Sequence, residues 1–301
     1  MVRTLAICSA LFLVGCVGEA PVDETGQALS DSELVPKGKG FLTRDASAGK
    51  TGGGGSQTIL YHNGPVMTGT TNVYYIWYGN WSGNSATSIL TDFANSIGGS
   101  PYFNINTTYY NSANVHVSNS VHYVSSTTDN YSQGTSLSDA QIQTVVASAI
   151  NGGKLPYDTG AVYFVLTSAD VTASSGFCTN YCGWHTHGTI NGGDIKYSFV
   201  GNPDRCPSSC AAQTTSPNGN AGADGMASIV AHELEETVTD PDLNAWYDRR
   251  GSENADKCAW TFGTQYSVAN GSKANVKLGT RDFLIQQNWV NSGAGFCAMS
   301  F

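Results

Sequence analysis

The sequence predicts an α/β (α+β) fold: a single domain with a mixed sheet, an active-site helix and a disulfide-stapled irregular region. Three observations support this prediction. Strand and helix patterns alternate along the chain, one helical segment carries His and Glu at metal-ligand spacing, and four cysteines fall in an otherwise irregular stretch. Alternating strands and helices are typical of a sheet that is covered by helices.

Five segments up to residue 167 show these patterns. Two apolar, aromatic runs are typical of buried strands, and a third segment alternates apolar and polar residues, as a half-exposed strand does. Two others repeat apolar residues at helical spacing, and the second of these begins with a capping box, in which Ser138 is followed by Gln141. In chain order the segments are a strand at 72–78, a helix at 85–97, a half-exposed strand at 115–124, a helix at 138–150 and a strand at 161–167.

Composition indicates a folded extracellular protein with many polar loops. Only 12% of the residues are charged, 11% are aromatic, and the formal net charge is −9. This aromatic content does not fit a disordered chain. No basic cluster interrupts the acidity, so we expect no nucleic-acid partner.

The first residues predict export. Arg3 precedes an apolar run from Leu5 to Val14, which is too short to span a bilayer but suits the core of a signal peptide. The run ends in Leu13-Val14-Gly15-Cys16, which resembles a bacterial lipobox, whose Cys becomes acylated. The alternative is an ordinary cleaved signal in which Cys16 is incidental. We expect an exported protein, lipid-anchored to the cell envelope (the outer membrane if the host has one) or extracellular, with no membrane contact except through the lipid.

The remaining chain divides into a linker and one domain. Residues 17–57 show no periodicity and end in a run of glycines, which is typical of a flexible linker. The predicted organisation is therefore a lipoprotein signal peptide at 1–16, a linker at 17–57 and a folded domain at 58–301.

Cysteine usage agrees with export. Cys8 and Cys16 belong to the leader, which leaves an even number for the domain, and an even number in an exported chain predicts disulfides. Two Cys-x-x-x-Cys pairs leave a thiolate zinc site as an alternative, although this spacing is wider than is usual for zinc. The sequence does not choose a pairing among Cys178, Cys182, Cys206, Cys210, Cys258 and Cys297.

A helix is predicted at 224–239, with Asp224 as its N-cap and Pro241 forcing its end. It contains His232-Glu233-Leu234-Glu235-Glu236. His232 and Glu236 are four residues apart and therefore share one face of the helix, where both can reach one cation. The alternative is a solvated, Glu-rich helix, but apolar residues recur along the same segment and predict that it is buried.

Glu233 follows the first candidate ligand, where the zinc-peptidase motif His-Glu-x-x-His places its general base. In that motif the carboxylate takes a proton from metal-bound water, whose pKa the metal has lowered. Glu236 stands in place of the second His and makes the site harder, so calcium and manganese compete with zinc. We expect one divalent metal, zinc first, and a zincin-like domain.

A third protein ligand is expected downstream of the helix. Asp256 lies 24 residues after His232, the spacing of thermolysin-like sites, and Glu253 precedes it on the same segment. Asp242 lies ten residues after His232, the spacing of metzincin-like sites, but it flanks Pro241 and is also typical of a turn. The order of preference is Asp256, then Glu253, then Asp242.

His185 is the second catalytic candidate beside Glu233. It lies in Cys182-Gly183-Trp184-His185-Thr186-His187, where two imidazoles two residues apart could reach a metal or form a substrate-side wall. The functional interpretation is a donor to a developing oxyanion. The alternative is a disulfide-held loop with one stacked and one exposed imidazole.

Short motifs recur in a consistent order from Gly64 to Cys297. They are Gly64-Pro65-Val66-Met67-Thr68-Gly69, Tyr75-Ile76-Trp77-Tyr78-Gly79, Val165-Leu166-Thr167-Ser168, Phe177-Cys178, Cys182-Gly183-Trp184-His185, Val200-Gly201-Asn202, Cys206-Pro207, Cys210-Ala211, Asp224-Gly225-Met226 and Asn244-Ala245-Trp246-Tyr247. This region resembles the phosphate-induced/EXORDIUM family of secreted proteins, best known from plant cell walls. The resemblance implies an apoplastic or cell-surface role without an agreed enzymatic activity. With its His-Glu-x-x-Glu helix the sequence resembles a bacterial branch with a zincin-like site. The lipobox departs from the plant members, which carry ordinary signal peptides.

Two functions follow from these features. The first is a lipid-anchored, extracytoplasmic, metal-dependent hydrolase, a peptidase that uses metal-activated water on a peptide or cell-surface polymer. His232, Glu236 and Asp256 hold the metal in this interpretation, and Glu233 is the base. The alternative is a non-catalytic EXORDIUM-like cell-surface or glycan-binding protein whose metal site is structural. A structural site has no need of Glu233.

Overall fold

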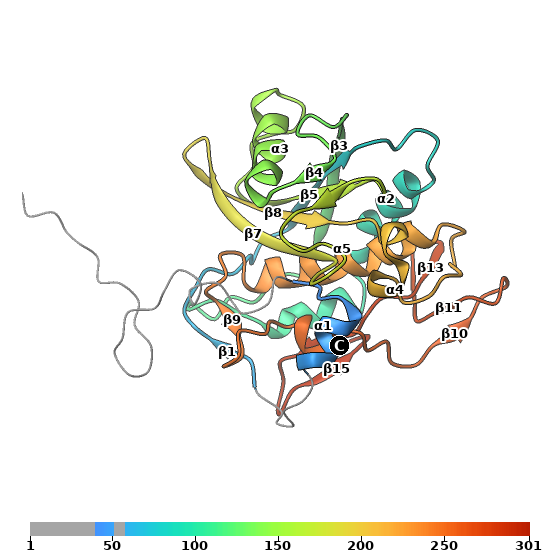
Figure 1. The fold of residues 1–301 in the computed structure, drawn as a ribbon. Coiled ribbons are helices and arrows are strands. Elements are labelled where there is room, and N and C mark those ends of the chain that lie inside the picture. Colours follow the sequence, from blue (N-terminus) through green and yellow to red (C-terminus); the bar gives the residue numbers. More distant parts are fainter. Residues whose placement is uncertain (1–39, 51–57) are drawn as a thin grey trace, which may run out of the picture. The chain divides into compact units, whose positions relative to one another are not determined.

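A five-stranded mixed sheet forms the centre of the domain (Figure 1). Four strands are parallel, and the fifth, β7, is an antiparallel edge strand. The computed structural model describes residues 40–50 and 58–301, all within one structural unit. Cys16 and the predicted signal peptide lie outside the described residues. The strands, in spatial order, are β3 (Val121–Asp129), β2 (Thr71–Tyr78), β5 (Ala161–Thr167), β8 (Gly193–Val200) and β7 (Gly183–Ile190).

Helices cover both faces of the sheet. The chain passes from β2 through α2 (Ala86–Ile97) to β3, and then back across β2 through α3 (Asp139–Asn151) to β5. Parallel crossovers are right-handed, so two crossovers in opposite directions place their helices on opposite faces. Figure 1 shows α3 on one face, with α2 and the long helix α5 (Ala221–Thr239) packed together on the other. The predicted α/β class with a mixed sheet is therefore confirmed.

The helix and strand patterns up to residue 167 match the structure with one shift. The capping box of α3 is present, since the Ser138 side chain accepts from the Gln141 backbone and Gln141 returns a bond to the Ser138 backbone. The half-exposed strand predicted at 115–124 is wrong in its bounds, because β3 spans Val121–Asp129. Its alternating burial continues past residue 124 through Ser and Thr residues, which carry no apolar signal.

The stretch that the sequence predicts to be irregular and disulfide-stapled, residues 170–223, is more regular than predicted. It contains the β-hairpin of β7 and β8, whose two-residue turn is Asn191-Gly192. Both turn residues have positive φ, 52° and 80°, as a type I′ turn requires. The expectation of an irregular region is wrong here, because an Asn-Gly hairpin signal was present in the sequence.

Helix α5 begins earlier than predicted. Asn220 is its N-cap and accepts a hydrogen bond from the Ala223 backbone N–H. Asp224 lies inside the first turns, where its carboxylate accepts bonds from Asn218 and Ser216. The prediction of Asp224 as the N-cap is therefore wrong. The helix ends at Thr239, before Pro241, as expected.

Residues 40–50, which the sequence places in the linker, fold against the domain. Helix α1 (Arg44–Lys50) packs on α4 (Pro207–Cys210), where Arg44 Nη2 donates to the Ala211 carbonyl at 2.8 Å. Small strand pairs and turns complete the fold. They are β1 (Leu60–Tyr61) with β9 (Trp246–Tyr247), β4 (Ser136–Leu137) with β6 (Thr172–Ala173), β10 (Tyr266–Ser267) with β11 (Lys273–Ala274), β12 (Val276–Leu278) with β13 (Arg281–Phe283), β14 (Asn288–Val290) with β15 (Phe296–Ala298), and the 3-10 turns η1 (Phe103–Thr108), η2 (Pro203–Arg205) and η3 (Asp256–Cys258).

The domain cysteines form three disulfides, as predicted. Cys178 pairs with Cys206 and Cys182 with Cys210, so the loop before β7 is linked to the first residue before α4 and to the last residue of α4. Cys258 pairs with Cys297 and ties η3 to β15. Disulfides of this kind persist in oxidising compartments, so the protein is an exported one.

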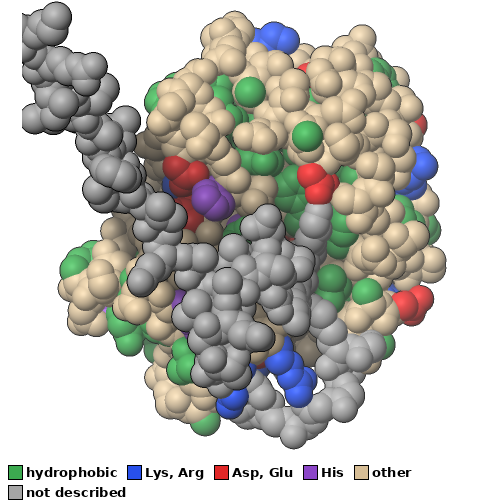
Figure 2. Space-filling view, turned by 60° about the vertical axis from the view of Figure 1, so that its left-hand side comes forward, with side chains coloured by type: hydrophobic (Ala, Val, Ile, Leu, Met, Phe, Trp, Pro, Cys, Tyr) green, Lys and Arg blue, Asp and Glu red, His purple; other side chains and the backbone are tan. Residues whose placement is uncertain are grey.

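The surface agrees with the low charge of the sequence. Figure 2 shows few charged side chains on the face in view, with one place where acidic side chains gather beside a histidine. Within residues 40–50 and 58–301, none of the helices is both long and apolar enough to span a bilayer.

Candidate metal centre

Helix α5 supplies the first two candidate ligands from a fully buried face. His232 and Glu236 lie one helical turn apart, and His232 Nε2 is 2.9 Å from Glu236 Oε1. Both side chains are 0% exposed. The alternative of a solvated, Glu-rich helix is therefore wrong: α5 packs against α2, β7 and β8, and every residue from 226 to 239 is buried, so its carboxylates lie inside the protein.

The segment that leads into η3 brings two acidic residues to the same point. Asp256 Oδ1 lies 3.7 Å from His232 Nε2, and the Asp256 backbone N–H donates to Glu236 Oε1 at 3.1 Å. Glu253 lies beside them and is 1% exposed. The sequence placed Asp256 and Glu253 first and second as the third ligand, and the structure brings both to the pair on α5.

The edge strand β7 contributes an imidazole. His185 Nε2 lies 3.2 Å from Glu253 Oε2 and 3.7 Å from Glu236 Oε2. Glu236 thus meets one histidine with each carboxylate oxygen. The residues form two overlapping groups that share Glu236: His185, Glu236 and Glu253 in one, and His232, Glu236 and Asp256 in the other. We refer to the five residues together as the His-carboxylate cluster. The sequence left His185 either as a residue that could reach a metal or as an oxyanion donor, and its position makes it a candidate ligand.

Asp242 and His187 lie elsewhere. Asp242 Oδ1 is 3.8 Å from His187 Nδ1 and 3.6 Å from Lys196 Nζ, in a partly exposed group that also contains Asp194. The Lys196 ammonium group lies 2.7 Å from Asp194 and balances the negative charge of the two carboxylates. The structure therefore does not bring Asp242, the third-ranked ligand, to His232.

The spacing of the cluster suits a first-row divalent cation. Zinc is bound at about 2.0–2.2 Å by imidazole nitrogen and carboxylate oxygen, which places tetrahedral ligand atoms about 3.4 Å from one another. Within the two groups, the separations run from 2.9 Å between His232 and Glu236 to 3.7 Å between His232 and Asp256. These side chains already stand at ligand separation, with side-chain exposures of 5% or less.

Burial makes the cluster electrostatically unfavourable without a cation. Removal from water raises the pKa of Glu253 well above its ordinary value, and the charges of Glu236 and Asp240 raise it further. The same two causes, burial first and the Glu236 charge second, raise the pKa of Glu233. Burial lowers the pKa of His185 to about 3, with repulsion from His232 as a further cause. A divalent cation reverses this balance, since it favours ionised carboxylates and neutral imidazoles.

Gln286 orients the imidazole of His232. The Gln286 amide lies 2.7 Å from Nδ1 and also donates to the Ala255 carbonyl at 3.0 Å. In this orientation the amide N–H points at Nδ1, so Nδ1 accepts and the proton of a neutral His232 ring sits on Nε2, facing Glu236. Ligation of a metal through Nε2 requires the Gln286 amide to turn so that its oxygen accepts from Nδ1–H, as supporting residues do at metal-binding histidines. Nothing in the sequence pattern indicated Gln286, because it follows His232 by 54 residues on an irregular segment.

Glu233 faces the cluster but is engaged by the backbone of a distant segment. Phe41 N–H donates to Glu233 Oε1 at 2.9 Å, and no hydrogen-bond partner of Oε2 is found among the described residues. The carboxylate is 0% exposed. The predicted general base is therefore covered, and the covering segment is residues 40–43, which the sequence analysis assigned to the linker.

These features belong to a protein of a recognised family. The conserved region of Phosphate-induced protein 1 matches residues 59–281. EXORDIUM-like 5 of Arabidopsis thaliana is 35% identical over 273 residues, covering 77% of this chain and 75% of that protein. EXORDIUM-like 3 of Arabidopsis thaliana is 32% identical, covering 81% and 84%, and PHOSPHATE-INDUCED 1 of Nicotiana tabacum is 32% identical, covering 64% and 68%.

The chain belongs to the phosphate-induced/EXORDIUM family. The family resemblance predicted from the short motifs between Gly64 and Cys297 is therefore confirmed. No solved structure matches the chain. The whole His-carboxylate cluster lies inside the matched region.

Proposed function

We propose that this protein is an exported, metal-binding member of the EXORDIUM family whose His-carboxylate cluster holds one divalent cation in a closed, structural site. The observation that carries this proposal is the cluster itself. Side chains from β7, α5 and the segment around η3 converge with almost no exposure. Structural sites have all positions filled by protein ligands, whereas catalytic sites keep one open. A cation here would join the edge of the sheet, the central helix and the C-terminal region.

The donor set favours zinc over calcium. Calcium takes six to eight oxygen ligands, and imidazole nitrogen is a poor partner for it. Two imidazoles with two or three carboxylates suit zinc, and manganese is the next choice. We therefore propose zinc.

Hydrolysis is the second candidate function, and Glu233 is the observation that favours it. Its carboxylate lies next to the first ligand, and burial raises its pKa well above the ordinary value. A raised pKa is typical of carboxylates that act as general bases. The antiparallel edge strand β7 beside α5 also fits a zincin-like arrangement. In this function the cation would supply Lewis acidity, Glu233 would accept the proton of the attacking water, and the substrate would be a peptide or cell-surface polymer. It requires residues 40–43 to leave Glu233.

We also propose that Cys16 is lipid-modified and that the lipid anchors the domain to the cell envelope. Mass spectrometry of the mature N-terminus tests it: we expect Cys16 as the first residue with acyl mass. A mature N-terminus at another residue, without acyl mass, would show an ordinary secreted protein instead.

Metal analysis of the purified full chain tests the proposed site. Wild-type protein is expected to hold about one zinc ion per chain after dialysis, and His232→Ala to hold none. Asp256→Ala and Asp242→Ala form a matched pair, because both remove a carboxylate after α5 and only Asp256 lies in the cluster. We expect loss of metal in the first and retention in the second. Equal metal content in wild type and His232→Ala would remove the site.

Glu233→Gln separates the two functions. Gln keeps the oxygen that accepts from Phe41 but cannot take a proton. We expect full metal content in this variant. If the metal site is only structural, neither the wild type nor the variant is expected to cleave peptides. Peptide cleavage by the wild type that falls by about 10²–10⁴-fold in Glu233→Gln would instead establish hydrolysis. Loss of metal from the variant would make Glu233 a ligand.

A further inference from the structure

Residues 40–43 bind to the domain as an extended peptide does. The Phe41 carbonyl accepts from the Cys182 backbone N–H at 2.7 Å, and Thr43 N–H donates to the Asn180 carbonyl at 3.1 Å. Leu42 forms an isolated antiparallel bridge with Tyr181. These are the main-chain bonds by which a peptide adds to the edge of a sheet, and they run along the residues that lead into the edge strand β7.

Two further bonds come from side chains of the domain. Glu233 Oε1 accepts from Phe41 N–H at 2.9 Å, and Trp260 Nε1 donates to the Leu42 carbonyl at 3.0 Å. Both backbone groups of Phe41, the Leu42 carbonyl and the Thr43 N–H are thus met by partners that lie far away in sequence. None of these bonds depends on the side chain of the bound residue.

The Phe41 side chain supplies the apolar anchor. Its ring packs edge-on against His232 and against Trp260, with 5.0 Å between ring centroids in each case, and it is 2% exposed. The residue before it must be small. A Cβ on Gly40 would lie 2.6 Å from both Glu233 oxygens and 2.7 Å from Trp184 Cα, and Gly40 has φ +48°. The recognised pattern is therefore a glycine followed by an aromatic residue.

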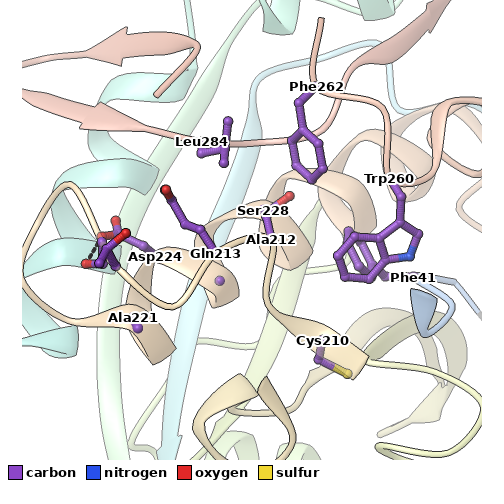
Figure 3. A pocket seen from close by; sticks show the side chains of 13 residues that line it. Phe41, Cys210, Ala212, Gln213, Ala221, Asp224, Ser228, Trp260, Phe262 and Leu284 are labelled. Carbon is purple, nitrogen blue, oxygen red and sulfur yellow. Dashed lines mark hydrogen bonds between the residues drawn. The ribbon is translucent and has the colours of Figure 1, made fainter. Parts of the chain in front are cut away.

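A pocket lies next to the Phe41 side chain. Figure 3 shows Phe41 and Trp260 together at one end of a pocket that extends past Ser228 toward Asp224. The walls around Phe41 lie within the region that defines the family, residues 59–281, and the 40–43 segment lies outside it. The binding surface therefore belongs to the domain, and its occupant comes from a separate stretch of the chain.

We propose that the surface formed by residues 180–184, Glu233 and Trp260 is a binding groove for an extended peptide with a Gly-aromatic pair, and that residues 40–43 occupy it as an internal ligand. The groove places the backbone of its ligand on Glu233 and the aromatic ring on His232. The proposal rests on these contacts and holds whether the cation beneath is structural or catalytic. Release of the internal ligand opens the groove to a peptide of another protein.

Competition in the full-length chain tests this. The probe is a fluorescent peptide with the sequence of residues 39–45, Lys-Gly-Phe-Leu-Thr-Arg-Asp, and its binding is followed by fluorescence anisotropy. In the wild type the attached segment holds the groove at an effective concentration on the order of millimolar, so micromolar probe is expected to stay free. Gly40→Ala is expected to displace the segment and allow saturable binding. Asp45→Asn, an exposed change on α1, is the matched control and is expected to behave as the wild type.

Two further experiments test the contributions of the Phe ring of the probe and of the Trp260 side chain of the groove. A probe with Ala in place of Phe is expected to bind Gly40→Ala at least about tenfold more weakly, because it lacks the ring between His232 and Trp260. Adding Trp260→Phe to Gly40→Ala removes one hydrogen-bond donor and is expected to weaken the Phe probe by about fivefold.

Hydrogen exchange of the Cys182 amide decides between the remaining outcomes. In Gly40→Ala this amide is expected to lose its protection and to regain it when the probe is added. Lost protection without probe binding would show that the groove does not take peptides. Unchanged protection in the double variant Gly40→Ala/Phe41→Ala would show that these contacts do not hold the segment. Either result overturns the proposal. Metal content measured on the same samples reports the cation site separately.

Discussion

Glu235 and Glu236 are neighbours in α5, yet their carboxylates lie in opposite surroundings. Glu236 Oε1 is 2.9 Å from His232 Nε2, whereas Glu235 Oε2 is 3.0 Å from the Tyr102 hydroxyl. Tyr102 also lies 2.8 Å from the Gln286 carbonyl, which accepts its single hydroxyl proton. A protonated Glu235 can then donate to Tyr102. One carboxylate thus belongs to the candidate metal centre and the other to a hydrogen-bonded core.

This contrast predicts opposite results for two adjacent substitutions. Glu236→Gln removes a charged ligand shared by both histidines and is expected to lower zinc affinity by more than about 100-fold, beyond the loss typical of a supporting residue. Glu235→Gln is expected to keep the wild-type affinity. Competition with a chromogenic zinc chelator measures both. Equal affinities in the two variants would contradict the assignment of Glu236.

The pH dependence of stability provides a second test of Glu235. Burial raises its pKa well above the ordinary 4.5, so the folded state keeps a proton that the unfolded state loses as pH rises. The wild type therefore loses stability above pH 4.5, by up to about 1.4 kcal/mol per pH unit from this group. Glu235→Gln has no such loss. In urea titrations, the free energy of unfolding of the variant is expected to rise relative to that of the wild type as pH increases above 4.5. A difference that is constant with pH would show that Glu235 is ionised in the fold.

The two histidines of β7 form another matched pair. His185 lies in the cluster, whereas His187 pairs with Asp194 at 2.7 Å on the partly exposed side. We expect His185→Gln to weaken zinc binding by at least about tenfold, the lower limit for residues that support a metal, and His187→Gln to leave it unchanged. Isothermal titration of chelator-treated protein with zinc measures the difference. A larger loss in the His187 variant would move the site to the group that contains Asp242.

The Cys258–Cys297 disulfide is expected to support both stability and the site. Its sequence separation of 39 residues predicts about 4 kcal/mol of stabilisation from loop closure. Cys258 also ends η3, the turn that positions Asp256. The double variant Cys258→Ser/Cys297→Ser should therefore unfold at lower denaturant and bind zinc more weakly. Removal of Cys178 and Cys206 is the control, and the prediction is wrong if that pair affects zinc binding equally.

The parts of the fold that the sequence predicted are local ones. The spacing of His232 and Glu236 and the capping box at Ser138 are properties of a single helix, so periodicity suffices to find them. Asp256 was placed by a spacing carried over from known metal sites. The β7–β8 hairpin was missed although Asn191-Gly192 marks its turn, because the surrounding cysteines and glycines suggested irregular structure.

The parts that the sequence did not predict depend on distant contacts. The hydrogen bond between Phe41 and Glu233 joins residues 192 apart, and nothing near Phe41 differs from an ordinary linker. The roles of Gln286 and Trp260 likewise follow from where irregular segments pass. Asn220 replaced Asp224 as the N-cap because both residue types suit the position, and only the structure shows which one meets a free backbone N–H.

The two disulfides beside β7 form a redundant pair. Cys178–Cys206 and Cys182–Cys210 each span 28 residues and are offset by four residues at both ends. Once one bond has closed the large loop, the other closes only the short remainder, so it adds little further constraint on the unfolded chain. The second bond keeps the loop before β7 attached when the first is reduced. After reduction of one bond, the loop before His185 remains attached at a cysteine only four residues away. Residues 180–184, which form one side of the groove, are therefore released from α4 only when both bonds are reduced.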